Sequence, residues 1–125
     1  MENNNIIYST DVWVSFNYGG WSIIFSKEFD LPFVPFHSMT LFDETNEYEN
    51  NVDFYTNEST YTTIMYRHPK NSFVVDVNNT WKFPVDSETI DEVIKIFTDT
   101  EWTRQDTTDL TALKDLMLKD SDRFK

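Results

Sequence analysis

Residues 11–25 read Asp-Val-Trp-Val-Ser-Phe-Asn-Tyr-Gly-Gly-Trp-Ser-Ile-Ile-Phe. In the first half, alternate residues share one face of an extended segment, and these are Val12, Val14 and Phe16. The second half, from Trp21, is rich in β-branched and aromatic residues, as strands are. Both glycines of the chain lie between the halves, where a turn can use positive φ. The stretch therefore predicts a β-hairpin.

Strand-like tracts continue beyond this hairpin. We expect strands at Met39–Phe42, Tyr61–Tyr66, Ser72–Val77 and Trp81–Phe83, with a turn at His68–Asn71. Two prolines make Phe29–Phe36 an extended connector. We expect its apolar side chains to be buried, although stiff aromatic segments also suit a docking surface. The acidic and amide-rich residues 43–51 predict a loop.

The apolar period changes to that of a helix after Pro84. Residues at helical spacing are Ile90, Val93, Ile94 and Phe97, which predicts a helix over 87–98 with Asp86 as its N-cap. A second helix is predicted over 108–119, capped by Asp106 or Thr107. Its inward residues are Leu110, Leu113, Leu116 and Met117.

Strands grouped before helices predict an α+β fold. We expect an antiparallel sheet of five or six strands over residues 6–83, with the two helices packed on it. The whole chain, 1–125, is predicted to be a single domain, because its length matches one core. Residues 120–125 are expected to be a frayed tail.

Charge narrows the possible partners. The chain carries a formal charge of −12, from 22 acidic and 10 basic residues. This charge disfavours direct binding to nucleic acid or anionic membranes, both of which need clustered cations. There is no cysteine, no run of about 18 apolar residues and no signal-peptide pattern. We therefore expect a cytoplasmic protein that binds neither nucleic acid nor a membrane.

Catalytic and metal-binding patterns are missing from the sequence. No glycine-rich loop is present to hold a phosphate, and His37 and His68 lie in no metal-ligand spacing. Residues 43–53 lack the central glycine and final glutamate of an EF-hand loop. No nucleophile motif occurs. We expect no catalytic residue, no metal and no cofactor, although a small carboxylate-based hydrolase remains an alternative.

The remaining signal is an acidic surface that could complement a basic partner. The first predicted helix and the residues after it supply Glu88, Asp91, Glu92, Asp99 and Glu101, and the predicted loop supplies Asp43, Glu44, Glu47 and Glu49. These nine residues are the predicted partner-binding site. The simpler explanation is that they only keep the protein soluble.

The informative features of the chain as a whole are its length, its charge, the absence of cysteine, the helical C-terminus (Asp86–Lys119) and the absence of catalytic motifs. In these features it resembles small acidic phage-encoded or mobile-element inhibitors, such as anti-CRISPR and other anti-defence proteins. This is a resemblance of type, and it implies binding rather than turnover, in the host cytoplasm if the chain is phage-encoded. We therefore predict an acidic interaction module, plausibly an inhibitor, that covers a basic or nucleic-acid-binding protein surface. The alternatives are a structural subunit and a small-ligand or nucleotide binder with an aromatic pocket, suggested by Trp13, Trp21, Tyr61 and Trp81.

Overall fold

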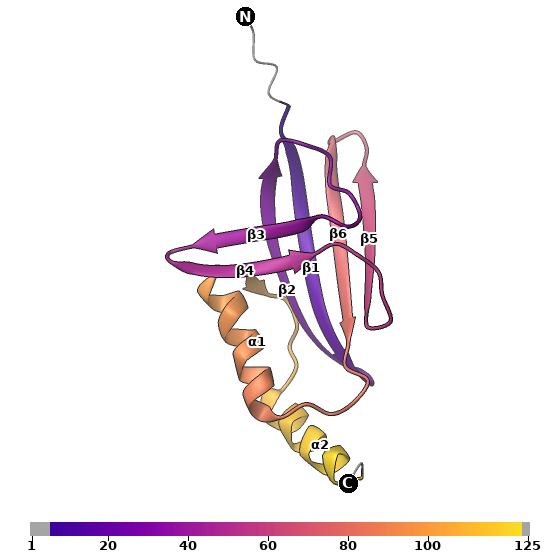
Figure 1. Cartoon of the computed structure of the whole chain (residues 1–125), viewed down its shortest axis with the longest axis vertical. Helices are drawn as coiled ribbons and strands as arrows, with labels where there is room; N and C mark the ends of the chain where they lie inside the picture. Colours follow the sequence, from indigo (N-terminus) through magenta and orange to yellow (C-terminus); the bar gives the residue numbers. More distant parts are fainter. Residues whose placement is uncertain (1–5, 124–125) are drawn as a thin grey trace, which may run out of the picture.

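The computed structural model describes residues 6–123, which form seven strands and two helices (Figure 1). In chain order these are β1 (Tyr8–Tyr18), β2 (Trp21–Leu31), β3 (Thr40–Thr45), β4 (Tyr48–Asp53), β5 (Thr60–Arg67), β6 (Ser72–Thr80), α1 (Ser87–Asp99), β7 (Thr103–Arg104) and α2 (Leu110–Arg123). The fold is α+β, as predicted from the order of strands and helices. Neither helix is long and apolar enough to cross a membrane.

The main sheet has five strands in the order β5-β6-β1-β2-β7, and β3 and β4 form a separate pair. The sheet is mixed rather than antiparallel, because β1 and β6 run parallel. The prediction was wrong on this point for a topological reason. After β2 the chain leaves the sheet, crosses its face as the hairpin β3–β4 and returns through β5. The β5–β6 hairpin therefore places β6 beside β1 in the same direction.

The β1–β2 hairpin is confirmed, and both strands extend beyond the predicted tracts. Tyr18 pairs with Trp21 across a two-residue turn, and Gly19 in that turn has φ +57°. β2 continues to Leu31, so it includes the first residues of the predicted connector. β6 likewise continues to Thr80, and Trp81–Phe83, predicted as a last strand, lies outside the sheet.

The rest of the predicted connector is exposed rather than buried. Phe33, Val34 and Phe36 are 44%, 46% and 54% exposed, respectively. Of the connector residues after β2, Pro35 is the buried one. The chain here only passes from the end of β2 to the start of β3, and its prolines keep it extended along the surface.

Residues 40–53 form the hairpin β3–β4, so the strand predicted at Met39–Phe42 is confirmed as part of β3, whereas residues 43–51 do not form the predicted loop. Its turn residues, Asn46 and Glu47, both have positive φ, as a two-residue hairpin turn requires. The hairpin lies across the main sheet (Figure 1) and buries Leu41 and Val52 against it. Asp43 is also buried, at 6% exposure. A polar side chain in an inward position hid the alternation that would have identified the strand.

The buried carboxylate of Asp43 holds the hairpin to the sheet and to the end of α1. Lys27 of β2 donates to both Asp43 oxygens at 3.1 and 3.0 Å, and to the carbonyl of Thr100 at 2.6 Å. The indole N–H of Trp102 donates to Asp43 Oδ2 at 2.7 Å. One ion pair thus links β2, β3 and the segment that follows α1.

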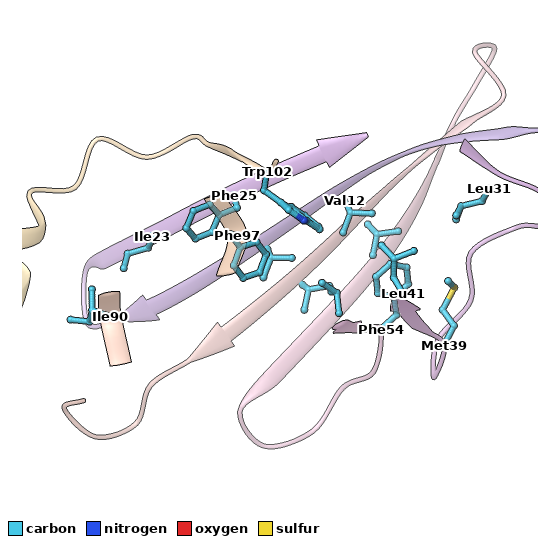
Figure 2. Close-up of a cluster of buried hydrophobic side chains, with 14 of the residues drawn as sticks. Val12, Ile23, Phe25, Leu31, Met39, Leu41, Phe54, Ile90, Phe97 and Trp102 are labelled. Atoms are coloured by element: carbon cyan, nitrogen blue, oxygen red, sulfur yellow. The ribbon is translucent and has the colours of Figure 1, made fainter. Parts of the chain in front are cut away.

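A hydrophobic core fills the space between the main sheet, the hairpin and the helices (Figure 2). The rings of Phe25 and Phe97 stack with centroids 4.5 Å apart, and Trp102 meets Phe97 edge-on at 5.1 Å. Val12 and Ile90 are fully buried in the same cluster. Large aromatic contacts of this kind supply much of the burial that stabilises a small domain.

The start of α1 is as predicted. Asp86 caps it by accepting from the backbone N–H of Thr89 at 2.8 Å. At its other end, the N–H of Glu101 bonds the carbonyl of Thr98 and that of Trp102 bonds the carbonyl of Phe97. This pair of bonds is a Schellman motif, which normally has glycine where Glu101 stands.

The prediction for α2 needs two corrections. Its capping residue is Asp109, which accepts from the N–H groups of Thr111 and Ala112, rather than Asp106 or Thr107. The helix also continues to Arg123, so residues 120–123 are not a frayed tail; residues 124 and 125 lie outside the described residues. Leu113 and Met117 are buried as predicted, while Leu110 and Leu116 are half-buried.

Asp106 attaches the segment before α2 to the edge of β2. It accepts from the N–H of Ile24 at 2.8 Å and from the guanidinium of Arg104 at 2.7 Å. Burial alone would raise the pKa of Asp106, but the bonds from Arg104, Ile24 and Thr108 together hold that pKa below its usual value. No local sequence pattern predicts this attachment, since β7 has only two residues.

We predict that Asp43→Ala lowers the free energy of unfolding by about 3 kcal/mol, because it leaves the Lys27 ammonium without its counter-ion. Glu44→Ala, one residue away on the exposed face, should change it by less than about 0.5 kcal/mol. Urea unfolding measures both. Equal stability of the two variants would contradict the structural role of Asp43.

We also predict that Asp106→Asn flattens the loss of stability in acid. The native pKa of Asp106 is lowered, so its contribution is present above the unfolded pKa and is lost as pH falls through the native pKa. In thermal unfolding, the difference in Tm between the variant and the parent should be smaller at pH 2 than at pH 7. A constant difference over that range would mean that the charge of Asp106 contributes nothing.

Candidate functional site

The hairpin brings four glutamates together at the end of α1. Glu44, Glu47 and Glu49 surround the tip of the hairpin, and Glu101 follows α1; all four are exposed. Asn46 at the tip donates to Glu101 Oε1 at 3.2 Å. We call Glu44, Glu47, Glu49 and Glu101 the tip cluster.

A second contact holds the hairpin tip against α1. The ammonium of Lys95 lies over the ring of Tyr48, 5.4 Å from its centroid, and bonds Asp99 at 2.7 Å. The hydrogen bond to Asp99 raises the pKa of Lys95. Sequence reasoning missed the contacts of Asn46, Tyr48 and Lys95, because only the hairpin geometry places Asn46 and Tyr48 beside α1 and the residues that follow it.

Like charges face each other directly on the outer surface of the hairpin. Glu44 pairs in register with Glu49, and the neighbouring pair is Phe42 with Asn51. Directly opposed like charges destabilise a strand pair, and within residues 6–123 neither Glu44 nor Glu49 has a cationic partner. Phe42, on this outer face, is 67% exposed, and Tyr48, which pairs in register with Thr45 on the opposite face, is 49% exposed. The hairpin thus combines uncompensated negative charge with exposed aromatic surface.

Asp43 does not belong to this surface. It was predicted beside Glu44 as a partner-binding residue, but its side chain is buried in the ion pair with Lys27. Strand alternation places Asp43 and Glu44 on opposite faces of β3. Sequence alone offers no means of telling these two carboxylates apart.

The remaining predicted residues lie along α1 and differ in their surroundings. Glu88 and Glu92 are exposed on the first part of the helix. Asp91 is paired with Lys114 of α2 at 2.6 Å, and Asp99 is paired with Lys95. With a rise of 1.5 Å per residue, Glu88 is about 17 Å from the end of α1 at Asp99. The nine predicted residues therefore do not form one continuous cluster.

Backbone strain also concentrates in the tip cluster. Glu47 has φ +71° and Glu101 has φ +64°, a region that costs most residues energy and that glycine adopts freely. Non-glycine residues in such conformations are enriched at functional sites. Both positions hold glutamate, where glycine would satisfy the backbone better.

The structure does not bring together the residues expected for the alternative functions, which were an aromatic ligand pocket and a carboxylate-based hydrolase. Trp13 and Tyr61 lie on the open face of the main sheet, whereas Trp21 and Trp81 pack against the core on the covered face, so the four aromatics do not line one pocket. Burial raises the pKa of Asp76 on the open face, but its neighbours in register are Trp13 and Thr63 rather than a second carboxylate. Residues 6–123 contain no group of three potential metal ligands.

We predict that Glu47→Gly raises the free energy of unfolding by about 0.5–1 kcal/mol, because glycine adopts positive φ without strain. Glu49→Gly, in the extended part of β4, should lower it, since glycine weakens a strand interior. Chemical denaturation compares the two. Destabilisation by Glu47→Gly would show that the turn needs its glutamate for folding.

Comparison with known proteins gives no family assignment: the chain matches no family model, and it shows no significant similarity to a curated protein or to a solved structure.

Proposed function

We propose that this protein is an acidic interaction module that binds a basic surface of a partner protein. The tip cluster and the exposed aromatics beside it form the contact surface, and Glu88 and Glu92 extend it along α1. By blocking the partner's basic surface, which would otherwise hold nucleic acid, the protein acts as an inhibitor in the cytoplasm. The resemblance of type to small acidic anti-defence proteins points in the same direction.

The observation that carries this proposal is the opposition of Glu44 and Glu49 on the hairpin, with Glu47 and Glu101 beside them. Repulsion among these carboxylates costs the free protein stability. A lysine- or arginine-rich surface would relieve that repulsion on binding. The strained φ angles of Glu47 and Glu101 support the same view, because both positions keep a charge where glycine would be more stable.

Exposed aromatic residues add a second kind of contact. Phe42 and Tyr48 are large side chains on the same hairpin as the acidic residues. Interfaces commonly combine an aromatic anchor with a polar rim that excludes water. Charge at the rim attracts the partner over distance and sets the association rate, while the anchor slows dissociation.

The test reverses charge at the tip cluster in the triple variant Glu44→Lys, Glu49→Lys and Glu101→Lys. The wild-type chain first captures its partner from a lysate of the cells that contain it, and association rates are then measured with the purified partner. We expect the triple variant to associate about tenfold more slowly at low salt, with little salt dependence.

A matched control separates the position of the charge from its amount. Asp30→Lys, Glu58→Lys and Asp115→Lys change the net charge equally at exposed sites away from the tip cluster. This control should associate much faster than the tip variant. Equal rates for the two folded variants would reduce the acidic surface to a solubilising role.

A further inference from the structure

β5 is an edge strand of the main sheet (Figure 1), and β6 is its one neighbour in the described part of the chain. An open edge presents unpaired N–H and C=O groups that can pair with another strand, and proteins usually protect it with charged residues, proline or a bulge. β5 contains no proline and no acidic residue, and its register with β6 is unbroken. Its one cation, Arg67, is already paired with Asp11 at 2.6 Å. This edge therefore lacks the usual protection.

The hydrogen bonds of β5 show which of its main-chain groups face the open edge. The N–H of Thr80 donates to the carbonyl of Ser59 at 2.8 Å, and the register continues unbroken from there. In an antiparallel pair every second residue bonds the neighbouring strand, and the residues between them point away from it. Ile64 and Tyr66 therefore direct both their N–H and their C=O groups away from β6.

The segment before β5 covers the first part of this edge. The hydroxyl of Thr56 accepts from the N–H of Thr62 at 3.1 Å, and Asn57 exchanges hydrogen bonds with Thr60. The strand ends at residue 67, where a turn begins. The edge therefore stays open over residues 63–67.

The open part of the edge is apolar on both faces of the sheet. Met65 at its centre is 43% exposed, and the neighbouring Tyr66 is 51% exposed on the opposite face. Ile64 is half-buried. A strand that pairs here gains both main-chain hydrogen bonds and apolar contacts.

Charge restricts where two copies of this chain can meet. Each copy carries a formal charge of −12, so their acidic surfaces repel each other. Every other described strand longer than two residues contains at least one acidic residue, as do both helices. An edge that pairs antiparallel with itself also closes a two-fold dimer. Among the described elements, β5 therefore lets a second copy pair over several residues with no carboxylate in either strand.

We propose that two copies of the chain form a dimer by antiparallel pairing of their β5 strands about a two-fold axis at Met65. Ile64 of each copy exchanges two main-chain hydrogen bonds with Tyr66 of the other, and the two main sheets become one continuous sheet. Met65 lies opposite Met65 of the other copy. The hairpin β3–β4 points its tip away from β5 (Figure 1), so each dimer carries two accessible tip clusters. This inference is independent of the proposed function.

Sedimentation velocity over about 5–500 µM protein tests the dimer. The paired surface is small, so we expect a dissociation constant of about 10–100 µM at physiological salt. Raising the salt from about 0.05 to 0.5 M should tighten the dimer about threefold, because it screens the repulsion between the two acidic chains. A chain that is monomeric at every concentration and salt would overturn the proposal, and would leave the β5 edge to a strand of a different protein.

The variant Met65→Glu puts two carboxylates opposite each other at the centre of the pairing, where like charges destabilise a strand pair. It should weaken dimerisation about tenfold. Leu118→Glu is the matched control, since it makes the same kind of change at an exposed position of α2, and it should dimerise nearly as tightly as the wild-type chain. Equal dimerisation of the two variants would contradict pairing through β5.

Cysteine cross-linking tests the register, and it remains informative if Met65→Glu fails to fold. The chain has no cysteine, so Met65→Cys introduces a single thiol. The Cα atoms of a directly opposed, non-hydrogen-bonded pair lie about 4.5 Å apart, which is within the range for a disulfide. Met65→Cys should therefore form a reducible covalent dimer under mild oxidation, whereas Leu118→Cys should stay monomeric. Equal cross-linking of these two variants would overturn the proposed interface.

Discussion

The ammonium of Lys27 lies on the face of the main sheet that packs against the hairpin and the helices. Its neighbours in register on β1 and along β2 are the core residues Val12 and Phe25. A charge in such a position is costly unless it is paired and hydrogen-bonded. Asp43 provides the pairing, and the carbonyl of Thr100 provides a further acceptor. The hairpin, the end of α1 and Trp102 therefore all meet at this ion pair.

That requirement explains which parts of the fold could be read from the sequence. The β1–β2 hairpin and α1 follow the ordinary periods of strand and helix, so their positions were predictable. The hairpin β3–β4 has Asp43 and Asn50 facing inward, where apolar residues would have marked strands. The alternation of inward and outward residues in this hairpin can be recognised only when the ammonium of Lys27 is known to lie opposite Asp43. The short strand β7 depends on Asp106, which holds the chain to β2. No local sequence pattern predicts such an attachment.

The candidate site could likewise be predicted from the sequence only in part. Composition identified an acidic surface, and the helical period placed Glu88 and Glu92 on it. Which carboxylates meet at the hairpin tip depended on pairing between distant segments, so Glu101 could not be joined to Glu44 from sequence. The acidic residues are also not equivalent: Asp43 and Asp106 neutralise partly buried cations, Asp86 and Asp109 cap helices, and Asp91 joins α1 to α2. Much of the negative charge thus stabilises the fold.

The parallel pairing of β1 with β6 has a consequence for the chain during synthesis. β1 is the central strand, but the partner on one of its sides begins only at Ser72. At a synthesis rate of roughly 5–20 residues per second, several seconds pass between completion of the β1–β2 hairpin and the appearance of β6. During that interval an edge of β1 is unpaired, and unpaired edges recruit other strands. On the ribosome, the nascent protein is therefore most exposed to aggregation between completion of its first hairpin and arrival of its sixth strand.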